Sequence, residues 1–137
     1  MAEEDRNPFE GVPVIYQYTR KQAIEDGVLV DLSEWAAEDG FVIPVACTTV
    51  VWHDWIVPPQ GVQGLGQSER GRVHDVLWML LCAIRRGNRS TDQLLFQVIF
   101  LQAPGKQETV QLKAIIGPGD EGEPVMTIML PVMPSSA

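Results

Sequence analysis

The stretch that decides the fold is residues 69–86, which read ERGRVHDVLWMLLCAIRR. Its apolar side chains recur at steps of three and four, the spacing that places them on one face of an α-helix. They are Val73, Val76, Leu77, Leu80, Leu81 and Ile84. The other apolar residues of 78–83 widen this face to nearly the whole circumference, which predicts a helix in a central position. Gly87 follows as a C-terminal stop.

After this helix, the spacing of apolar residues changes from a helical pattern to one typical of strands. Residues 94–101 are rich in strand formers, and 110–116 alternate apolar with polar side chains. Residues 125–130 form a third apolar run, closed by Pro131. Because short turns at 103–106 and 117–124 connect the three runs, we expect a three-stranded antiparallel meander with the long helix packed on one face.

The N-terminal half predicts short helices. Thr19 and Gln22 form a capping box, which starts a helix over 20–26 that Gly27 ends. Asp31 or Ser33 caps a second helix that reaches about residue 38.

The residues that follow give a weaker pattern. Residues 41–46 contain Pro44 and are expected to form a connector or at most an edge strand. A third helix is expected from Thr48 or Thr49 to Trp55, and the glycine-rich segment 60–67, inside the region 58–68, is expected to be a loop.

These elements predict an α+β fold, because helices and strands are segregated along the chain. The sequence has 137 residues, a length typical of one domain. We therefore expect a single domain over 14–131, with a first strand over 14–18 and flexible tails at 1–13 and 132–137.

Charge and composition narrow the function classes. The net charge of −8 argues against direct binding of duplex DNA and against anionic membrane surfaces. The acidic N-terminus does not resemble a secretory signal, and the longest apolar run has nine residues. A soluble, cytoplasmic protein is therefore expected.

The reactive side chains show no arrangement typical of catalysis. His74 and Asp75 are adjacent, but His53 is the one other histidine, too few for a phosphohydrolase metal site. Cys47 and Cys82 lie in apolar runs, as buried reduced thiols do. The glycine segment lacks the Gly-Lys-Ser/Thr ending of a phosphate loop. No catalytic residue, cofactor or metal ligand is therefore assigned.

Two groups of residues are candidates for an interaction surface. Trp52 and Trp55 lie beside polar residues and a Pro-Pro break, where an exposed tryptophan could anchor a partner. Arg70 and Arg72 lie about 21 Å along the helix from Arg85 and Arg86. The arginines therefore form two patches, which either receive carboxylates or phosphate or solvate and cap the helix ends.

Three phrases, at residues 16–31, 75–80 and 117–131, are similar to those of a family of small uncharacterised proteins of bacteria, plasmids and phages. The resemblance covers residues 14–131 but not 53–68. It implies a bacterial or mobile-element origin and a stand-alone domain, and it brings no activity with it.

Three functions remain open. The first is a non-enzymatic protein that binds a protein partner or forms a homo-oligomer. The second is an acidic inhibitor of a host nucleic-acid-handling defence system, of the anti-restriction or anti-CRISPR type, in which carboxylates such as those of Glu34, Glu38 and Asp39 stand in for phosphates. The third is an enzyme with an unrecognised site, which a deep pocket that brings together Arg20, Asp31 or Asp75 would favour.

Overall fold

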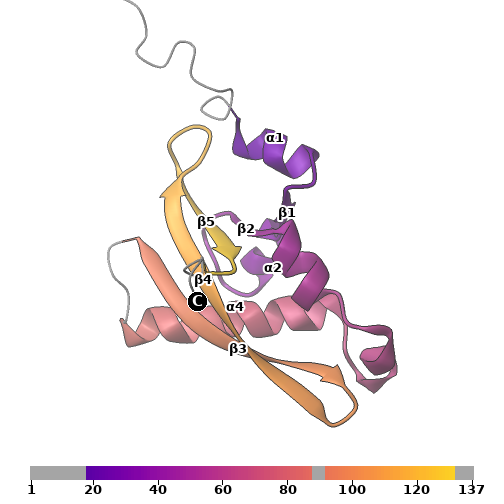
Figure 1. Cartoon of the computed structure of the whole chain (residues 1–137). Coiled ribbons are helices and arrows are strands. Elements are labelled where there is room, and N and C mark those ends of the chain that lie inside the picture. The colour runs from indigo at the N-terminus through magenta and orange to yellow at the C-terminus, as the bar shows by residue number, and fades with distance from the viewer. Residues whose placement is uncertain (1–17, 88–91, 132–137) are drawn as a thin grey trace, which may run out of the picture.

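The protein folds around one five-stranded sheet with a long helix across one face (Figure 1). The computed structural model describes residues 18–87 and 92–131. The strands are β1 (Leu29–Asp31), β2 (Val45–Thr48), β3 (Gln93–Ala103), β4 (Lys106–Pro118) and β5 (Pro124–Met129). Their order in the sheet is β1-β2-β5-β4-β3. The strand predicted over 14–18 and the tails lie almost wholly outside the described residues.

The α-helices are α1 (Arg20–Glu25), α2 (Ser33–Glu38), α3 (Thr49–Val51) and α4 (Glu69–Arg86). A π-helical turn, η2 (Trp52–Ile56), continues α3, so the third predicted helix is present in an irregular form. The predicted capping box at α1 is confirmed, because the side chains of Thr19 and Gln22 each accept a hydrogen bond from the other's backbone N–H. The long helix is confirmed over 69–86, ending at Gly87 with φ 69°.

The α+β class is confirmed, but the sheet is larger than the predicted meander. Strands β3, β4 and β5 do pair antiparallel in sequence order. Strand β2 then pairs parallel with β5, and β1 pairs antiparallel with β2. The prediction of a three-stranded sheet was therefore incomplete, because these additional strands are short and pair with distant parts of the chain.

Strand β2 corrects the expectation for 41–46. It is an inner strand, with Val45, Ala46 and Cys47 all buried. Pro44 does not prevent this because it lies just before the strand, where its carbonyl accepts a hydrogen bond from the Met126 N–H at 2.9 Å.

The segment predicted as a loop contains a 3₁₀ helix, Gln60–Leu65. Val62 in this turn is fully buried, which ties the segment to the core. It ends at Gly66 with φ 80°, a backbone conformation that glycine adopts at little cost.

The core lies between α4 and one face of the sheet. Alternate residues of β3, namely Leu94, Phe96, Val98 and Phe100, point toward the helix. Cys47 is buried in this core, and burial raises the pKa of its thiol to about 12. Cys82 on α4 is only partly buried, which departs from the expectation of two buried thiols, and both cysteines are free.

Candidate interaction surface

Arg72, one of the predicted surface arginines, lies inside the protein and is 2% exposed. Its guanidinium donates to the carbonyl of Trp55 at 2.8 Å and to the carbonyl of Leu101. It also donates to the side-chain oxygens of Gln67 and Gln102, both at 3.0 Å. Burial lowers its pKa, although the charge of Asp75 opposes this shift. Arg72 therefore joins η2, α4 and β3 and is withdrawn from any surface.

Arg70 is held by the neighbouring helix α2. Its guanidinium forms ion pairs with Asp39 at 3.0 Å and Glu38 at 3.2 Å, and it lies over the ring of Trp35. His74 lies 3.3 Å from the other carboxylate oxygen of Asp39. The hydrogen bond from Arg70 lowers the pKa of Asp39 and raises that of Arg70. This cluster fastens α2 to the start of α4.

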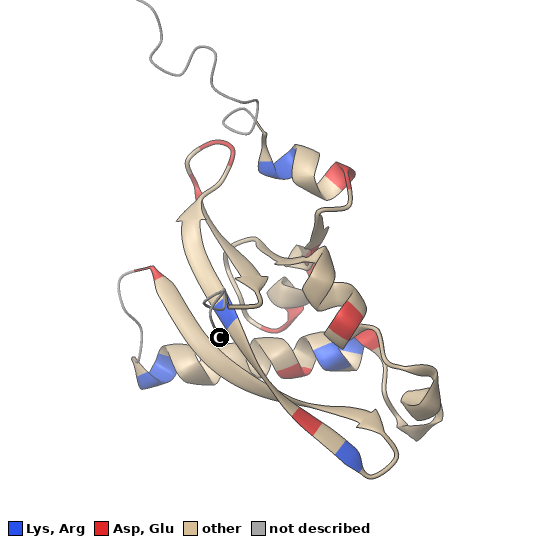
Figure 2. Cartoon of the chain, viewed as in Figure 1, with Lys and Arg blue, Asp and Glu red and all other residues tan. Residues whose placement is uncertain are grey.

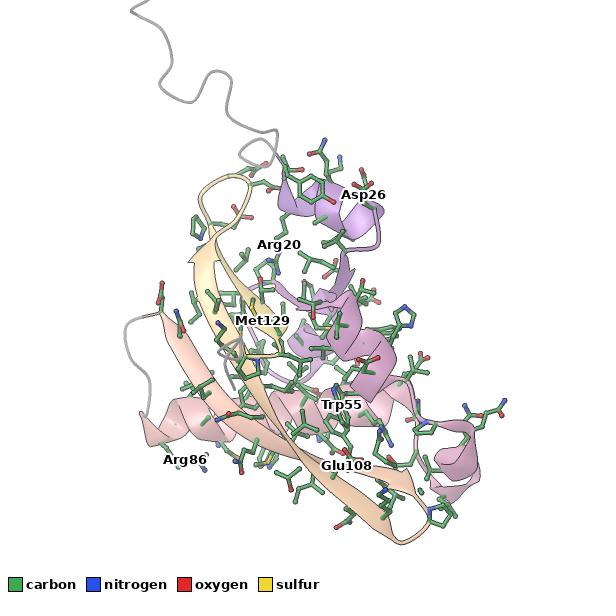
Figure 3. The ribbon with its side chains drawn as sticks, in the orientation of Figure 1. Arg20, Asp26, Trp55, Arg86, Glu108 and Met129 are labelled. Atoms are coloured by element: carbon green, nitrogen blue, oxygen red, sulfur yellow. The ribbon has the colours of Figure 1, made fainter. Side chains whose placement is uncertain are left out.

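The two predicted tryptophans pack against other aromatic rings. Trp52 stacks on Trp35 with ring centroids 6.5 Å apart, and Trp55 lies 5.6 Å from Phe100. Both are half-buried beside the core. Of the six predicted interaction residues, Arg85 and Arg86 alone are fully on the surface. Arg86 lies at the C-terminal end of α4, whereas Trp55 lies toward its other end (Figure 3).

The surface that sequence reasoning missed is the free edge of the sheet. Strand β3 is the last strand and pairs with β4 on one side, with no described strand on its other side. In an antiparallel pair, every second residue of a strand turns its backbone N–H and C=O toward the partner strand. The Ile116 N–H donates to the Asp92 carbonyl at 3.0 Å, so Asp92 and every second residue after it face β4. The backbone groups of Leu95, Gln97 and Ile99 therefore point away from β4.

The side chains along this edge are uncharged and partly apolar. No Asp, Glu, Lys or Arg occurs in Gln93–Ala103, and β3 carries no charged position in Figure 2. Leu95 is 52% exposed and Ile99 is 58% exposed on the outer face of the sheet. Trp78 on the neighbouring helix is 51% exposed. A long, uncharged edge with exposed apolar side chains is typical of a pairing site for another strand.

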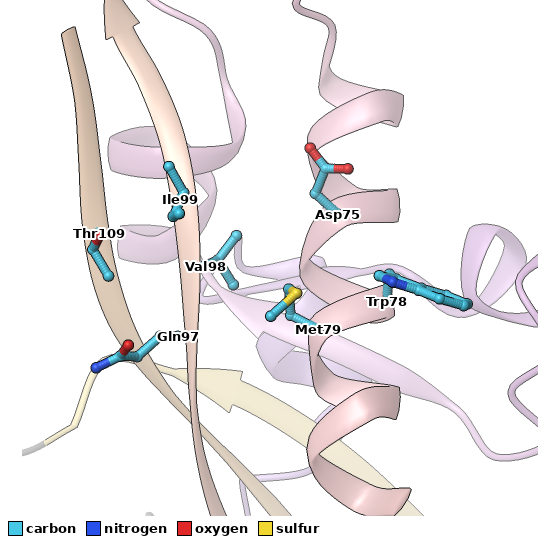
Figure 4. A pocket seen from close by; sticks show the side chains of 7 residues that line it. All are labelled: Asp75, Trp78, Met79, Gln97, Val98, Ile99 and Thr109. Carbon is cyan, nitrogen blue, oxygen red and sulfur yellow. The ribbon is translucent and has the colours of Figure 1, made fainter.

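A hollow of about 340 Å³ runs along this edge between α4 and β3. Met79 points into it from the helix, facing Val98 and Ile99 on the strand, and Asp75 lies at its upper end in Figure 4. Most of its lining is apolar. The sequence did contain a signal for this edge: a run without charge in which both alternating faces hold apolar residues.

The first part of β4 is also unpaired on one side, but unlike β3 it is charged. Strand β5 pairs with β4 only from Lys113 onward, so residues 106–112 of β4 have no described strand on that side. This stretch carries Lys106 and Glu108. Charged side chains discourage strand pairing, which distinguishes it from β3.

A second recess, of about 390 Å³, lies between α1 and the β4–β5 hairpin and contains Arg20 and Asp31. Several of its polar groups already have hydrogen-bond partners. Arg20 donates to the Thr127 hydroxyl and the Met126 carbonyl, both at 2.8 Å. Asp120 accepts from the backbone N–H groups of Arg20 and Lys21, at 2.7 and 3.0 Å. These contacts attach α1 to the sheet and occupy the guanidinium of Arg20.

No group of three or more potential metal-binding side chains occurs within residues 18–87 and 92–131. Over the same residues, no helix has the length and apolar character needed to cross a membrane.

Comparison with known proteins places the chain in a family. A protein-family profile matches residues 5–133, almost the whole sequence. The chain belongs to DUF6573, a family of unknown function. No curated protein and no solved structure matches it. The predicted resemblance to an uncharacterised family is thereby confirmed, and membership of DUF6573 brings no activity to assign to the β3 edge.

Proposed function

We propose that this protein acts without catalysis, by binding another protein chain that adds a strand to the free edge of β3. The observation that carries the proposal is the edge itself: eleven uncharged residues, outward backbone groups at Leu95, Gln97 and Ile99, and a hollow beside them. An added strand satisfies these backbone donors and acceptors, and apolar side chains supply further affinity.

The two alternatives receive less support. An acidic phosphate mimic was expected to use Glu34, Glu38 and Asp39, but Arg70 already pairs with Glu38 and Asp39. An enzyme was expected to bring Arg20, Asp31 or Asp75 together in a pocket. Arg20 and Asp31 do line one recess, but Arg20 is bonded to Thr127 and Met126, and Asp31 accepts from the Ser33 N–H.

A photo-cross-linking amino acid placed in the chain tests the proposal inside the organism that makes it. Position 99 samples the β3 edge, and position 50 on α3 is a matched control because Val50 is 51% exposed. We expect one polypeptide to be cross-linked in high yield from position 99 and from position 95, and not from position 50. Mass spectrometry identifies that polypeptide, whether it is a second copy or another protein. Equal, low yields at all three positions contradict the proposal.

A further inference from the structure

We infer that the strand received by the β3 edge is β3 of a second copy, so that the protein is a two-fold symmetric dimer with one continuous ten-stranded sheet. This inference rests on the proposed function and specifies the partner. It commits to an antiparallel pairing whose axis passes through Gln97.

The sequence of β3 complements itself around Gln97. In this register Leu95 pairs with Ile99 of the second copy, and Gln97 pairs with Gln97 of the second copy. Each of these residues has its backbone N–H and C=O directed outward, so each pair exchanges both hydrogen bonds. The exposed apolar side chains of Leu95 and Ile99 then become cross-strand neighbours, which stabilises a sheet. The register therefore satisfies the polar backbone and the apolar side chains together.

Contacts beyond Ile99 limit the ladder. The carbonyl of Leu101 also points away from β4, but it accepts a hydrogen bond from Arg72. The same alternation directs the backbone of Gln93 outward, and in this register Gln93 pairs with Leu101, whose carbonyl is already occupied. Complete pairs therefore form at Leu95, Gln97 and Ile99, centred on Gln97. A symmetric centre of this kind fits an identical strand running in the opposite direction.

Electrostatics also favours a second copy at this position. Each chain has a net charge of −8, so two copies repel each other over most of their surfaces. Strand β3 is uncharged, and the helix beside it carries charges of both signs. The β3 edge is therefore where two copies approach with the least repulsion.

The helix adds a specific charge complement. It runs antiparallel to β3, because Arg72 bonds to Leu101 near one end and Ile84 lies beside Leu94 near the other. Pairing of the strands places the two α4 helices side by side in opposite directions. Asp75 and Arg86 are three turns apart, about 16 Å, on the same side of α4. In the dimer, Asp75 of each copy then faces Arg86 of the other.

The midpoint of Asp75 and Arg86 agrees with the axis chosen from the strand. It falls at residues 80–81, within one turn of Met79, which lines the hollow together with Gln97 and Val98. The same axis therefore relates the two strands and the two helices. The second helix closes the open side of the hollow, which removes the exposed part of Met79 from water.

The experiment is analytical ultracentrifugation of the full-length chain over a concentration series. We expect a monomer–dimer equilibrium in the micromolar range. Gln97→Pro removes an outward N–H without removing a bond to β4, and we expect it to weaken dimerisation at least about thirtyfold. Its urea midpoint, measured at a concentration where the wild-type chain is monomeric, is expected to stay close to that of wild type.

A charge exchange tests the helix contact. Asp75→Arg and Arg86→Asp are each expected to weaken dimerisation about tenfold, because each places like charges opposite one another. The double variant restores opposite charges between copies, and we expect its dissociation constant to return to within about threefold of wild type. Glu34→Arg, which changes an exposed charge on α2, is the control and leaves the constant within the same limit.

The outcomes separate the two proposals. A chain that stays monomeric at millimolar concentration overturns the dimer, and if position 99 still cross-links a different protein in cells, the proposed function survives. A dimer that tolerates Gln97→Pro, or in which the double charge variant shows no recovery, overturns this geometry. A monomer without cross-links from position 99 overturns both.

Discussion

The two edge strands of the sheet, β1 and β3, differ in how readily they can pair with a further strand. Strand β1 has three residues, ends at Asp31 and packs beside α1. Strand β3 has eleven residues and no charge, and no described strand lies on its outer side. Edge strands that are short, charged or covered resist pairing, whereas long uncharged ones promote it. The comparison indicates that β1 terminates the sheet, and it supports the proposal that β3 is an interface.

Helix α4 anchors one end of the β3 edge through the side chain of Arg72. Arg72 bonds to the carbonyl of Leu101 and to Gln102, where β3 contains a register irregularity between Leu101 and Ala103. The same guanidinium bonds to Trp55 on η2 and lies over the ring of Phe100. One buried side chain therefore fixes the end of the open strand.

The largest effect is expected when this support is removed. Arg72→Ala leaves two backbone carbonyls and two side-chain oxygens without their donor, and we expect a loss of about 3 kcal/mol in the free energy of unfolding. Urea titration followed by tryptophan fluorescence measures it. Arg70→Ala, two residues earlier and partly exposed, is the control and is expected to cost about 1 kcal/mol or less. Equal losses would contradict the supporting role of Arg72.

A smaller effect is expected in amide exchange along β3. In the Gln97→Pro variant, the N–H groups of Leu95 and Ile99 point to water, and we expect them to exchange at least about tenfold faster than those of Phe96 and Val98. The rates are measured by NMR and corrected for intrinsic exchange.

Strand β4 provides the control for this alternation. Ala114 pairs with β3 and Ile115 with β5, so both are flanked by strands, and we expect their N–H groups to exchange at similar, slow rates. Uniform protection along β3 would show that its outer edge is not free, and would remove the contrast with β1.

The sequence predicted the parts of the fold that depend on neighbouring residues. The capping box of Thr19 and Gln22 is a local signal, and so is the spacing of apolar residues in 69–86. Both were correct, because each pattern contains its own physical cause. The strand formers of 94–101, the alternation in 110–116 and the short turns between the runs likewise predicted the antiparallel meander.

The parts that were missed depend on distant residues. Strand β2 pairs parallel with β5, about 80 residues away in the chain, and its four residues are too few to show a period. Pro44 argued against an inner strand, but it precedes the strand. Parallel pairing over this separation leaves no mark on the local sequence.

The candidate surface was missed for a related reason. Arg70 and Arg72 were grouped because they are close in sequence, although they point to different sides of α4. Arg72 lies four and eight residues before Val76 and Leu80, on the buried face, and that spacing was a signal for its burial. The uncharged run of β3 was a signal for an unusual strand, but its place at the edge of the sheet could not be inferred, because the strand order decides which strand is last.

The smallest effect concerns the attachment of α1 at the covered end. Hydrogen bonds from the backbone N–H groups of Arg20 and Lys21 lower the pKa of Asp120. A carboxyl group with a lowered pKa stabilises the fold above its unfolded-state pKa, near 3.9, and this contribution is lost as the pH falls through the lower folded-state pKa. We therefore expect a small decrease in melting temperature for Asp120→Asn at pH 7. The difference from wild type should disappear in acid, as the wild-type carboxyl group becomes protonated.

Glu121→Gln, at the tip of the same hairpin, tests whether loss of any acidic charge there has this effect. If it reproduces the pH dependence, α1 is not held by Asp120, and the covered end of the sheet depends on packing of Ala23 and the bonds of Arg20.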